Sequence, residues 1–378
     1  MIPSDEQIMI RDMARAFAAE QITPFAADWE DRAHFPRDVF AAMGRLGLMG
    51  MTVPAEWGGA GLDYVTYAIA LEEIAAGDGA VAIVMSGHNS VGCMPLLEYG
   101  TQTQKDRYLR RLAQGELLSA FALTEAKGGS DAGALITRAE RRDGGYIING
   151  GKQFITTGKN ADLCLVIAVT DPDRGKRGIS AFLVPTDTPG YEVVRVEKKM
   201  GQNASDTAQL AFNDMAVPGD ALLGEEGQGY RIALGNLEGG RIGIAAQALG
   251  MARAAFEVAL LYAREREAFG KPIFEHQAVA FRLADMATQL EAARQLIWHS
   301  AALRGAGQKC LKEASMAKLF ATDMAEAVCS DAMQTLGGYG YLQDFPVERI
   351  YRGVCGARIY EGTNDIQKLV IARDLTAE

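Results

Sequence analysis

The sequence predicts an α+β protein in which a helical section, a small β-section and a second helical section follow one another. Residues 1–118 carry helix-capping spacings, and residues 119–228 carry short runs rich in Val, Ile, Thr, Tyr and Phe between turn residues. Residues 229–378 are rich in Ala, Leu, Met, Glu and Arg, which form helices readily. Because strands and helices do not alternate along the chain, a doubly wound dinucleotide-binding fold is disfavoured.

Helix-start signals mark the first section. Ser4 is followed by Gln7 and Thr101 by Gln104, which is the spacing of a capping box. Residues 58–61 read Gly-Gly-Ala-Gly and predict a loop between helices.

Short strands are expected in the middle section. Residues 146–150 end in Asn149-Gly150, a dipeptide that favours a hairpin turn. Residues 179–184 and 191–196 are further strand candidates, and the charged residues 171–178 predict a surface turn. We expect these strands to form a small antiparallel sheet or barrel.

Long helices are expected in the last section, because prolines are widely spaced there. The predicted helices span 229–267, 275–304, 308–336 and 347–374, the last of them broken at Gly362.

Composition narrows the class of function. The chain has 378 residues, 48% of them hydrophobic, and its 38 basic and 48 acidic residues give a net charge of −10. A field of that sign opposes binding to nucleic acid or anionic membranes. The cysteines are odd in number, without a CxxC pair, and the four histidines are scattered, so we expect neither disulfides nor a metal site. The N-terminus has no signal-peptide pattern, and we expect a cytoplasmic protein.

Two segments of the middle section could bind a cofactor. In residues 121–131 a short strand leads into the loop Gly128-Gly129-Ser130, whose backbone N–H groups could approach a ring or a pyrophosphate. Residues 153–158 place Phe154 before two threonines, which could stack on a flat ring and bond its edge. A plain turn and an ordinary amphipathic strand are the alternative interpretations.

Four segments of the last section are also candidates. Gly239 and Gly240 lie inside a predicted helix, where each is unfavourable by roughly 1 kcal/mol relative to alanine, so a ligand or a tight packing contact is expected there. Arg266 could hold a pyrophosphate, and residues 334–340 could end a helix or touch an anion. Glu361, beside Gly362, could be a general base if burial raises its pKa, or an ordinary surface residue.

Taken in order, these segments resemble the acyl-CoA dehydrogenase family over essentially the whole chain, with the short-chain and short-branched-chain members most similar. The matching segments are residues 121–131, 154–156, 240–243, 266–270, 334–340 and 359–363. The resemblance implies an N-terminal helical domain at 1–118, a middle β-domain at 119–228 and a C-terminal four-helix bundle at 229–378. It also implies a homotetramer with FAD between the β-domain and the bundle, and electron-transfer flavoprotein as the electron acceptor.

The resemblance also implies roles for individual residues. Those expected to bind FAD are Phe121, Leu123, Thr124, Gly129, Ser130, Phe154, Ile155, Thr156, Arg266, Phe269, Gln277, Gln334, Gly337, Gly338, Thr363, Asn364 and Asp365. Those expected to contact the acyl-CoA are Ser130, Glu238, Arg241 and Gly362.

Glu361 is the catalytic base that the resemblance implies. It would remove the α-proton of the thioester while the β-carbon passes a hydride to flavin N5, giving the 2-enoyl-CoA. Some family members carry the base immediately before the arginine equivalent to Arg241, but that position is Gly240 here and has no side chain. Glu238 lies about 200° around the helix from Gly240 and should face elsewhere.

Three departures from the family pattern leave other functions open. Ala126-Lys127 replaces Pro-Gly, Phe154 replaces a common tryptophan, and residues 353–358 lack the usual acidic and basic residues. Arg358 could face a polar acyl group or be solvated. The alternatives are a flavoenzyme of the same fold with different chemistry, such as a desulfinase or an oxidase, and a non-enzymatic member that binds flavin or nucleic acid.

Overall fold

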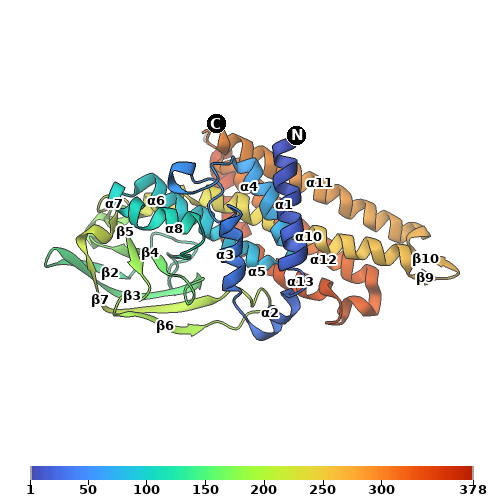
Figure 1. Ribbon diagram of the computed structural model, residues 1–378, viewed down its shortest axis with the longest axis horizontal. Helices are drawn as coiled ribbons and strands as arrows, with labels where there is room; N and C mark the ends of the chain where they lie inside the picture. The colour runs from blue at the N-terminus through green and yellow to red at the C-terminus, as the bar shows by residue number, and fades with distance from the viewer. Residues whose placement is uncertain (1, 377–378) are drawn as a thin grey trace.

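The computed structural model describes residues 2–376, and it has the predicted order of helices, sheet and helices. Figure 1 shows the sheet at one end of the long axis and the long C-terminal helices extending to the other end. The first N-terminal helices lie between them, the helices of residues 94–113 lie over the sheet, and the two chain ends lie close together.

Short helices make up the first part of the chain. Both predicted capping boxes are present, at Ser4 with Gln7 and at Thr101 with Gln104. The elements are α1 (Asp5–Gln21), α2 (Ala26–Arg32), α3 (Arg37–Arg45), η1 (Ala55–Trp57), α4 (Tyr64–Gly77), α5 (Gly79–Gly87), η2 (His88–Cys93), α6 (Met94–Tyr99), α7 (Gln102–Gln104), η3 (Lys105–Leu109) and α8 (Arg110–Ala113).

An eight-stranded sheet follows, in the order β6-β7-β3-β2-β4-β5-β8, with β1 paired to β4. Its strands are β1 (Ser119–Ala122), β2 (Arg138–Arg142), β3 (Gly145–Thr156), β4 (Leu163–Val169), β5 (Ile179–Pro185), β6 (Tyr191–Val196), β7 (Thr207–Pro218) and β8 (Leu222–Leu223). An antiparallel sheet or barrel was predicted, and the sheet is instead mixed, because β1 and β2 both pair with β4 in parallel. Strand 191–196 is confirmed residue for residue.

The predicted hairpin turn was misplaced. The turn between β2 and β3 is Asp143-Gly144, where both residues have positive φ, at 45° and 80°. A two-residue turn of this kind requires positive φ at both positions. Asn149 and Gly150 lie inside β3 at an irregularity in its pairing with β7, where the Asn149 side chain bonds Asp214.

Six α-helices, three of them long, make up most of the last part of the described chain. The predicted helix 229–267 is two helices, because the chain breaks at Asn236 between α9 (Gly229–Gly235) and α10 (Leu237–Glu265). The others are α11 (Gln277–Gly305), α12 (Leu311–Leu336), α13 (Pro346–Ala357) and α14 (Asn364–Leu375), with η7 (Gly337–Tyr341) after α12 and the short strands β9 (Glu267–Ala268) and β10 (Lys271–Pro272) after α10. The predicted break at Gly362 is confirmed, since it lies between α13 and α14.

The main core joins the N-terminal helices to the bundle. Helices α4 and α10 are largely buried, and α10 also packs on α11, α12 and α13. Residues Gly79–Tyr99 and Gly229–Glu265 are long and apolar enough to cross a membrane, but 78% and 61% of their most apolar windows are buried inside the protein. Interior packing therefore accounts for their apolar character.

Candidate active site

Glu361 lies in the turn between α13 and α14. Its φ is 54°, and that of Gly362 is 87°. A left-handed backbone is unfavourable for a residue with a side chain by roughly 1–2 kcal/mol, and such strain gathers at functional sites. Thr363 then starts α14, where its hydroxyl accepts a bond from the Ile366 N–H at 3.3 Å.

Buried side chains anchor this turn from two helices. Lys318 on α12 donates to the Gly362 carbonyl at 3.0 Å and to Asn364 Oδ1 at 2.8 Å. Gln367 on α14 donates to the same carbonyl at 2.7 Å and to the Glu361 carbonyl at 3.3 Å. These bonds hold the strained conformation in place.

The Glu361 carboxylate is directed to α10, at a position that has no side chain. A Cβ placed on Gly240 would be 2.7 Å from Glu361 Oε2. Oε2 is buried and has no hydrogen-bond partner within the protein. Burial raises the pKa of Glu361 to about 7, although the positive charges of Arg241 and Lys318 oppose the rise. The carboxylate is thus a base that is half ionised near neutral pH.

Three buried polar side chains lie on α10 or against it, close to Gly240. Arg241 donates to the Ser315 hydroxyl at 3.4 Å, while its Nε has no partner within the protein. Tyr67 and Ser86, from α4 and α5, bond each other at 3.3 Å. Both press on α10 one turn after Gly240, since a Cβ on Gly243 would be 2.2 Å from Ser86 Oγ.

A second polar group lies on α10 next to Gly239. Arg304 pairs with Glu238 at 3.1 Å and its guanidinium lies over the Tyr64 ring at 4.9 Å. A Cβ on Gly239 would be 3.4 Å from Arg304 Nε. Seven side-chain N or O atoms of residues 2–376 are buried without a partner, and six belong to Tyr64, Asn236, Arg241, Arg304, Glu361 and Gln367. Unsatisfied buried groups at one place indicate that a polar ligand completes them.

The two candidate cofactor segments of the middle domain lie side by side. The Gln153 N–H donates to the Thr124 carbonyl at 2.8 Å, and Lys152 donates to the Leu123 carbonyl at 2.9 Å. Lys152 also forms a buried ion pair with Glu125 at 2.8 Å. The sheet thus fixes the base of the glycine-rich loop.

Surfaces on these two segments are open. Gly129 and Ser130 are exposed, and a Cβ on Gly129 would meet nothing closer than 3.7 Å. Phe154 is 63% exposed at a φ of 58°, whereas Leu123 and Ile155 are buried. Phe121, Thr124 and Thr156 are half-buried.

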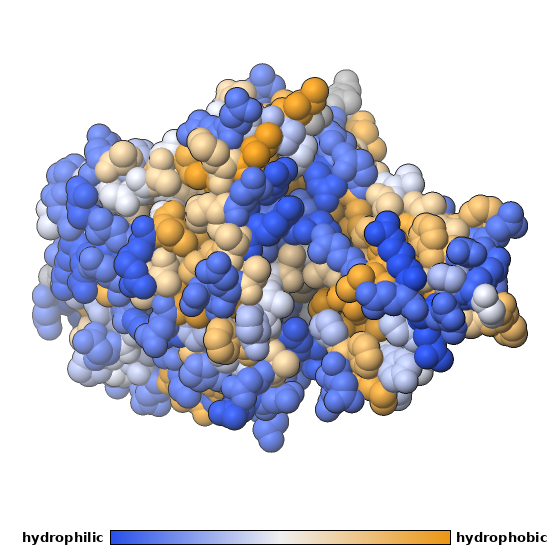
Figure 2. All heavy atoms as spheres, turned by 45° about the vertical axis from the view of Figure 1, so that its right-hand side comes forward, coloured by the Kyte–Doolittle hydropathy of each residue, from blue (hydrophilic) through white to orange (hydrophobic). Residues whose placement is uncertain are grey.

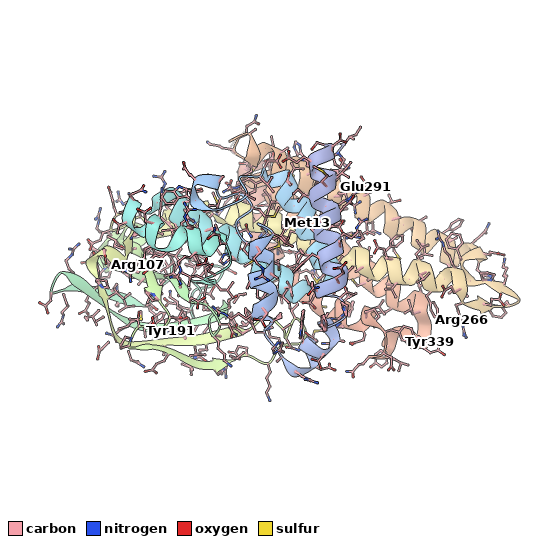
Figure 3. All side chains as sticks on the ribbon, viewed as in Figure 1. Met13, Arg107, Tyr191, Arg266, Glu291 and Tyr339 are labelled. Carbon is pink, nitrogen blue, oxygen red and sulfur yellow. The ribbon has the colours of Figure 1, made fainter. Side chains whose placement is uncertain are left out.

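The remaining predicted cofactor residues lie elsewhere. Arg266, Phe269 and Gln277 are exposed around β9 and the start of α11, and Gln334, Gly337 and Gly338 are exposed at the end of α12. Figure 3 shows Arg266 near Tyr339 at the bundle end, with Tyr191 of the sheet at the opposite end. One chain therefore does not bring these two groups together.

Residues 363–365 form the start of α14. Thr363 caps α14, and Asp365 is exposed. The Asn364 side chain is buried in bonds with Lys318, Thr322 and Asp323. Its side chain therefore supports the Glu361 turn.

Comparison with known proteins identifies the family. Residues 4–116, 120–215 and 227–376 match the N-terminal, middle and C-terminal domains of acyl-CoA dehydrogenase. An acyl-CoA dehydrogenase of Bacillus subtilis is 50% identical over 98% of both chains. The chain belongs to the acyl-CoA dehydrogenase family. It is therefore an oxidoreductase that acts on a CH–CH bond.

Other relatives bear on the substrate. The mitochondrial short-chain specific acyl-CoA dehydrogenase of Bos taurus is 46% identical over 99% of this chain and 90% of its own. Butyryl-CoA dehydrogenase of Megasphaera elsdenii superposes with a TM-score of 0.97, at 39% identity over 100% and 99% of the chains. A glutaryl-CoA dehydrogenase superposes with a TM-score of 0.97, at 34% identity over 100% of this chain and 96% of its own. A prolyl acyl carrier protein oxidase superposes with a TM-score of 0.96, at 34% identity over 99% of this chain and 100% of its own.

Two departures from the acyl-CoA dehydrogenase pattern lie outside the Glu361 site. Arg358 pairs with Asp323 at 2.9 Å and with Glu326, both on α12, so its guanidinium is occupied. The thiol of Cys355 donates to the Tyr351 carbonyl within α13. Of the two alternatives for Arg358, these contacts give no support to the one in which it faces a polar acyl group.

Sequence reasoning missed Lys318, Gln367, Tyr64 and Arg304. Only Lys318 carried a signal, because a lysine stands among alanines on the buried face of a helix. Gln367 contacts the turn five and six residues before it, while Tyr64 and Arg304 meet only through the packing of distant helices.

Proposed function

We propose that this protein is an FAD-dependent dehydrogenase that converts a short or short-branched acyl-CoA thioester to the 2-enoyl-CoA, with Glu361 as the base. One observation carries the proposal. Glu361 Oε2 is buried, has no partner within the protein and lies against Gly240, and its pKa is raised to about 7. An ordinary surface glutamate has none of these properties.

The protein's own groups prepare the proton transfer. Glu361 takes the α-proton of the thioester, while its backbone N–H donates to the thioester oxygen and stabilises the developing negative charge. Arg241 and Lys318 stabilise the ionised carboxylate. The acyl chain excludes water and raises the basicity of Glu361 further.

The acyl chain is short in this proposal. Tyr67 and Ser86 close on α10 at Gly243. Gly243 is three residues from Gly240, about 4.5 Å along the helix axis. An extended chain beyond Glu361 therefore has limited room on that side. Relatives with short-chain specific activity are in keeping with this.

The residues of the two open segments fit FAD. Gly129 leaves space above an exposed loop, and Phe154 offers an exposed ring. Thr124, Ser130 and Thr156 supply hydroxyl groups, and Phe121, Leu123 and Ile155 support them. When bound, FAD supplies the acceptor for the hydride that leaves the β-carbon.

A second copy of the chain completes the FAD site in this proposal. Arg266, Phe269, Gln277, Gln334, Gly337 and Gly338 lie at the opposite end of the molecule from the sheet, so they would hold the pyrophosphate and adenine of a neighbour's FAD. Exposed apolar side chains mark the same end, namely Leu261, Phe269, Phe274, Phe281, Tyr341 and Leu342. Figure 2 shows apolar side chains on this end. Such a patch favours association, here into a homotetramer.

Ser130, Glu238, Arg241 and Gly362 contact the acyl-CoA, and Thr363, Asn364 and Asp365 are placed beside the cofactor. The protein works in the cytoplasm, where its five unpaired cysteines stay reduced. We propose electron-transfer flavoprotein as the electron acceptor. One similar chain comes from a structural study of the electron transferring flavoprotein of Acidaminococcus fermentans. It is 43% identical to this chain, with a TM-score of 0.98 over the full length of both.

The test is a panel of straight, branched and carboxylated acyl-CoA thioesters, assayed with an artificial electron acceptor. Short thioesters should be oxidised, and Glu361→Gln should lower kcat by at least a thousandfold. Glu265→Gln, at the exposed end of α10, is the matched control. Full activity of Glu361→Gln would refute the assignment. Peroxide as the main reduced product would indicate an oxidase.

A further inference from the structure

Lys318 is a cation in the interior of the bundle. Its side chain is fully buried on α12, on a face rich in alanine that also carries the hydroxyl groups of Ser315 and Thr322. An ammonium group in such a position is unfavourable unless it is paired. Its partners therefore indicate what it does.

The partners of Lys318 all belong to the turn that carries Glu361. The ammonium donates to the Gly362 carbonyl at 3.0 Å and to Asn364 Oδ1 at 2.8 Å. The Thr322 hydroxyl donates to Asn364 Oδ1 as well, at 3.1 Å. Gly362 and Asn364, on either side of Thr363, are thus held by one charged group on α12.

We propose that Lys318 is a positioning residue for the reaction, which fixes the Glu361–Gly362 turn and keeps the Glu361 carboxylate ionisable inside the protein. The inference rests on the proposed role of Glu361. Lys318 acts through that carboxylate and touches no substrate atom in this proposal.

Geometry explains why a charged residue is needed. The Glu361 backbone is held at a φ of 54°, and the carbonyl that follows it is fixed by Lys318 and Gln367. A neutral donor could hold the Gly362 carbonyl. Of the two cations that lower the pKa of Glu361, however, only Arg241 would then remain. Two flanking cations offset the burial of a carboxylate better than one does.

The electrostatics of the pair agree with this role. Burial lowers the pKa of Lys318 to about 8, and the negative charge of Glu361 opposes that shift. Lys318 is therefore still mostly protonated at pH 7. The other groups that influence this pair are Arg241 on α10, Tyr67 on α4, Tyr360 beside Glu361, Asp323 on α12 and Arg358 after α13.

The test compares Lys318→Met with Lys318→Arg in the FAD-containing enzyme. The methionine variant removes the charge, so the acid limb of the kcat/KM profile should move up by about one pH unit, and the rate at pH 7 should fall about fivefold. The fall should lie in kcat, with KM changed less than twofold. Lys318→Arg keeps the charge and should keep the wild-type acid limb.

A second readout reports the base without electron transfer. Exchange of the substrate α-proton in D₂O depends on Glu361, so it should slow in Lys318→Met with the same pH shift. Thr322→Val is the structural control, because it weakens the Asn364 contact without changing a charge. It should lower the melting temperature and leave the acid limb in place.

Two outcomes overturn the inference. One is an acid limb in Lys318→Met that coincides with wild type, and the other is the same shift in Thr322→Val. Failure of the proposed function looks different: the folded wild-type enzyme would then oxidise no thioester, or Glu361→Gln would match wild type. If Glu361→Gln loses activity while Lys318→Met keeps the wild-type acid limb, the Lys318 inference alone is refuted.

Discussion

Gly240→Ala should impair catalysis while it leaves the fold intact. The added methyl group would lie 2.7 Å from Glu361 Oε2, 3.1 Å from its Cδ and 3.4 Å from its Oε1. Ordinary contact begins near 3.4 Å, so the carboxylate has to retreat by about 0.7 Å. The carboxylate is the far end of a flexible side chain, and it will move before the helix does.

The displacement determines the size of the effect. A misplacement of about 1 Å at a reacting group can reduce the rate on the order of a hundredfold. We therefore expect kcat to fall by about 10- to 100-fold. Replacing a helical glycine by alanine also stabilises the helix by about 1 kcal/mol, so the melting temperature should hold or rise. Activity and stability should thus move in opposite directions.

Steady-state kinetics on a short acyl-CoA and thermal melting of the same preparation measure both effects. Gly239→Ala is the matched control, in the same helical turn, because its Cβ would be 3.4 Å from Arg304 Nε and the Tyr64 ring, at ordinary contact distance. Its loss of kcat should be at least tenfold smaller. Equal losses in both variants would refute the contact between Gly240 and the base, and so would full activity of Gly240→Ala.

Three further predictions concern the ionisation of Glu361 and the loop at residues 125–131. Glu361 must be ionised to act as the base, and burial raises its pKa to about 7. The value of kcat/KM should therefore rise with pH up to about 7 and then level off. A flat profile from pH 5 to 8 would contradict this. The same raised pKa favours the protonated carboxyl in the folded state. Wild type should therefore lose stability relative to Glu361→Gln as the pH rises from about 4.5 to about 7, as denaturant titrations would measure. Lys152→Met leaves the buried Glu125 carboxylate without its ion-pair partner, so it should destabilise the protein by about 3–5 kcal/mol and lower the FAD content. Lys127→Met, at an exposed position, is the control. An unchanged melting temperature and FAD content in Lys152→Met would count against the role of the ion pair.

Local signals in the sequence predicted much of the fold. Capping depends on residues three apart, so Ser4 with Gln7 could be recognised from the sequence alone. Strand 191–196 and the break at Gly362 also follow from local patterns. The Asn149-Gly150 prediction failed because a second dipeptide with the same preference, Asp143-Gly144, lies six residues earlier. Composition alone does not decide between two adequate turn sequences.

Features of the site that depend on distant contacts could not be predicted in this way. Lys318 and Gly362 are 44 residues apart, and Arg304 and Glu238 are 66 apart. These contacts depend on how the helices pack against one another. A hydrophobic pattern predicts only which face of a helix is buried, not which residues on two helices will meet. The glycines at 239 and 240 did indicate an unusual packing contact. The identity of the group packed on Gly240, the Glu361 carboxylate, emerged only in three dimensions.

The contact between Gly240 and Glu361 gathers several unfavourable features in one place. Glycine within a helix is unfavourable by about 1 kcal/mol, and a left-handed glutamate by about 1–2 kcal/mol. A buried carboxylate without a partner adds a further destabilisation. Each feature alone would be an accident of packing. Together they place one proton acceptor in an enclosed space and hold it there from two helices. The stability of the fold does not require this arrangement, whereas a proton-transfer reaction does.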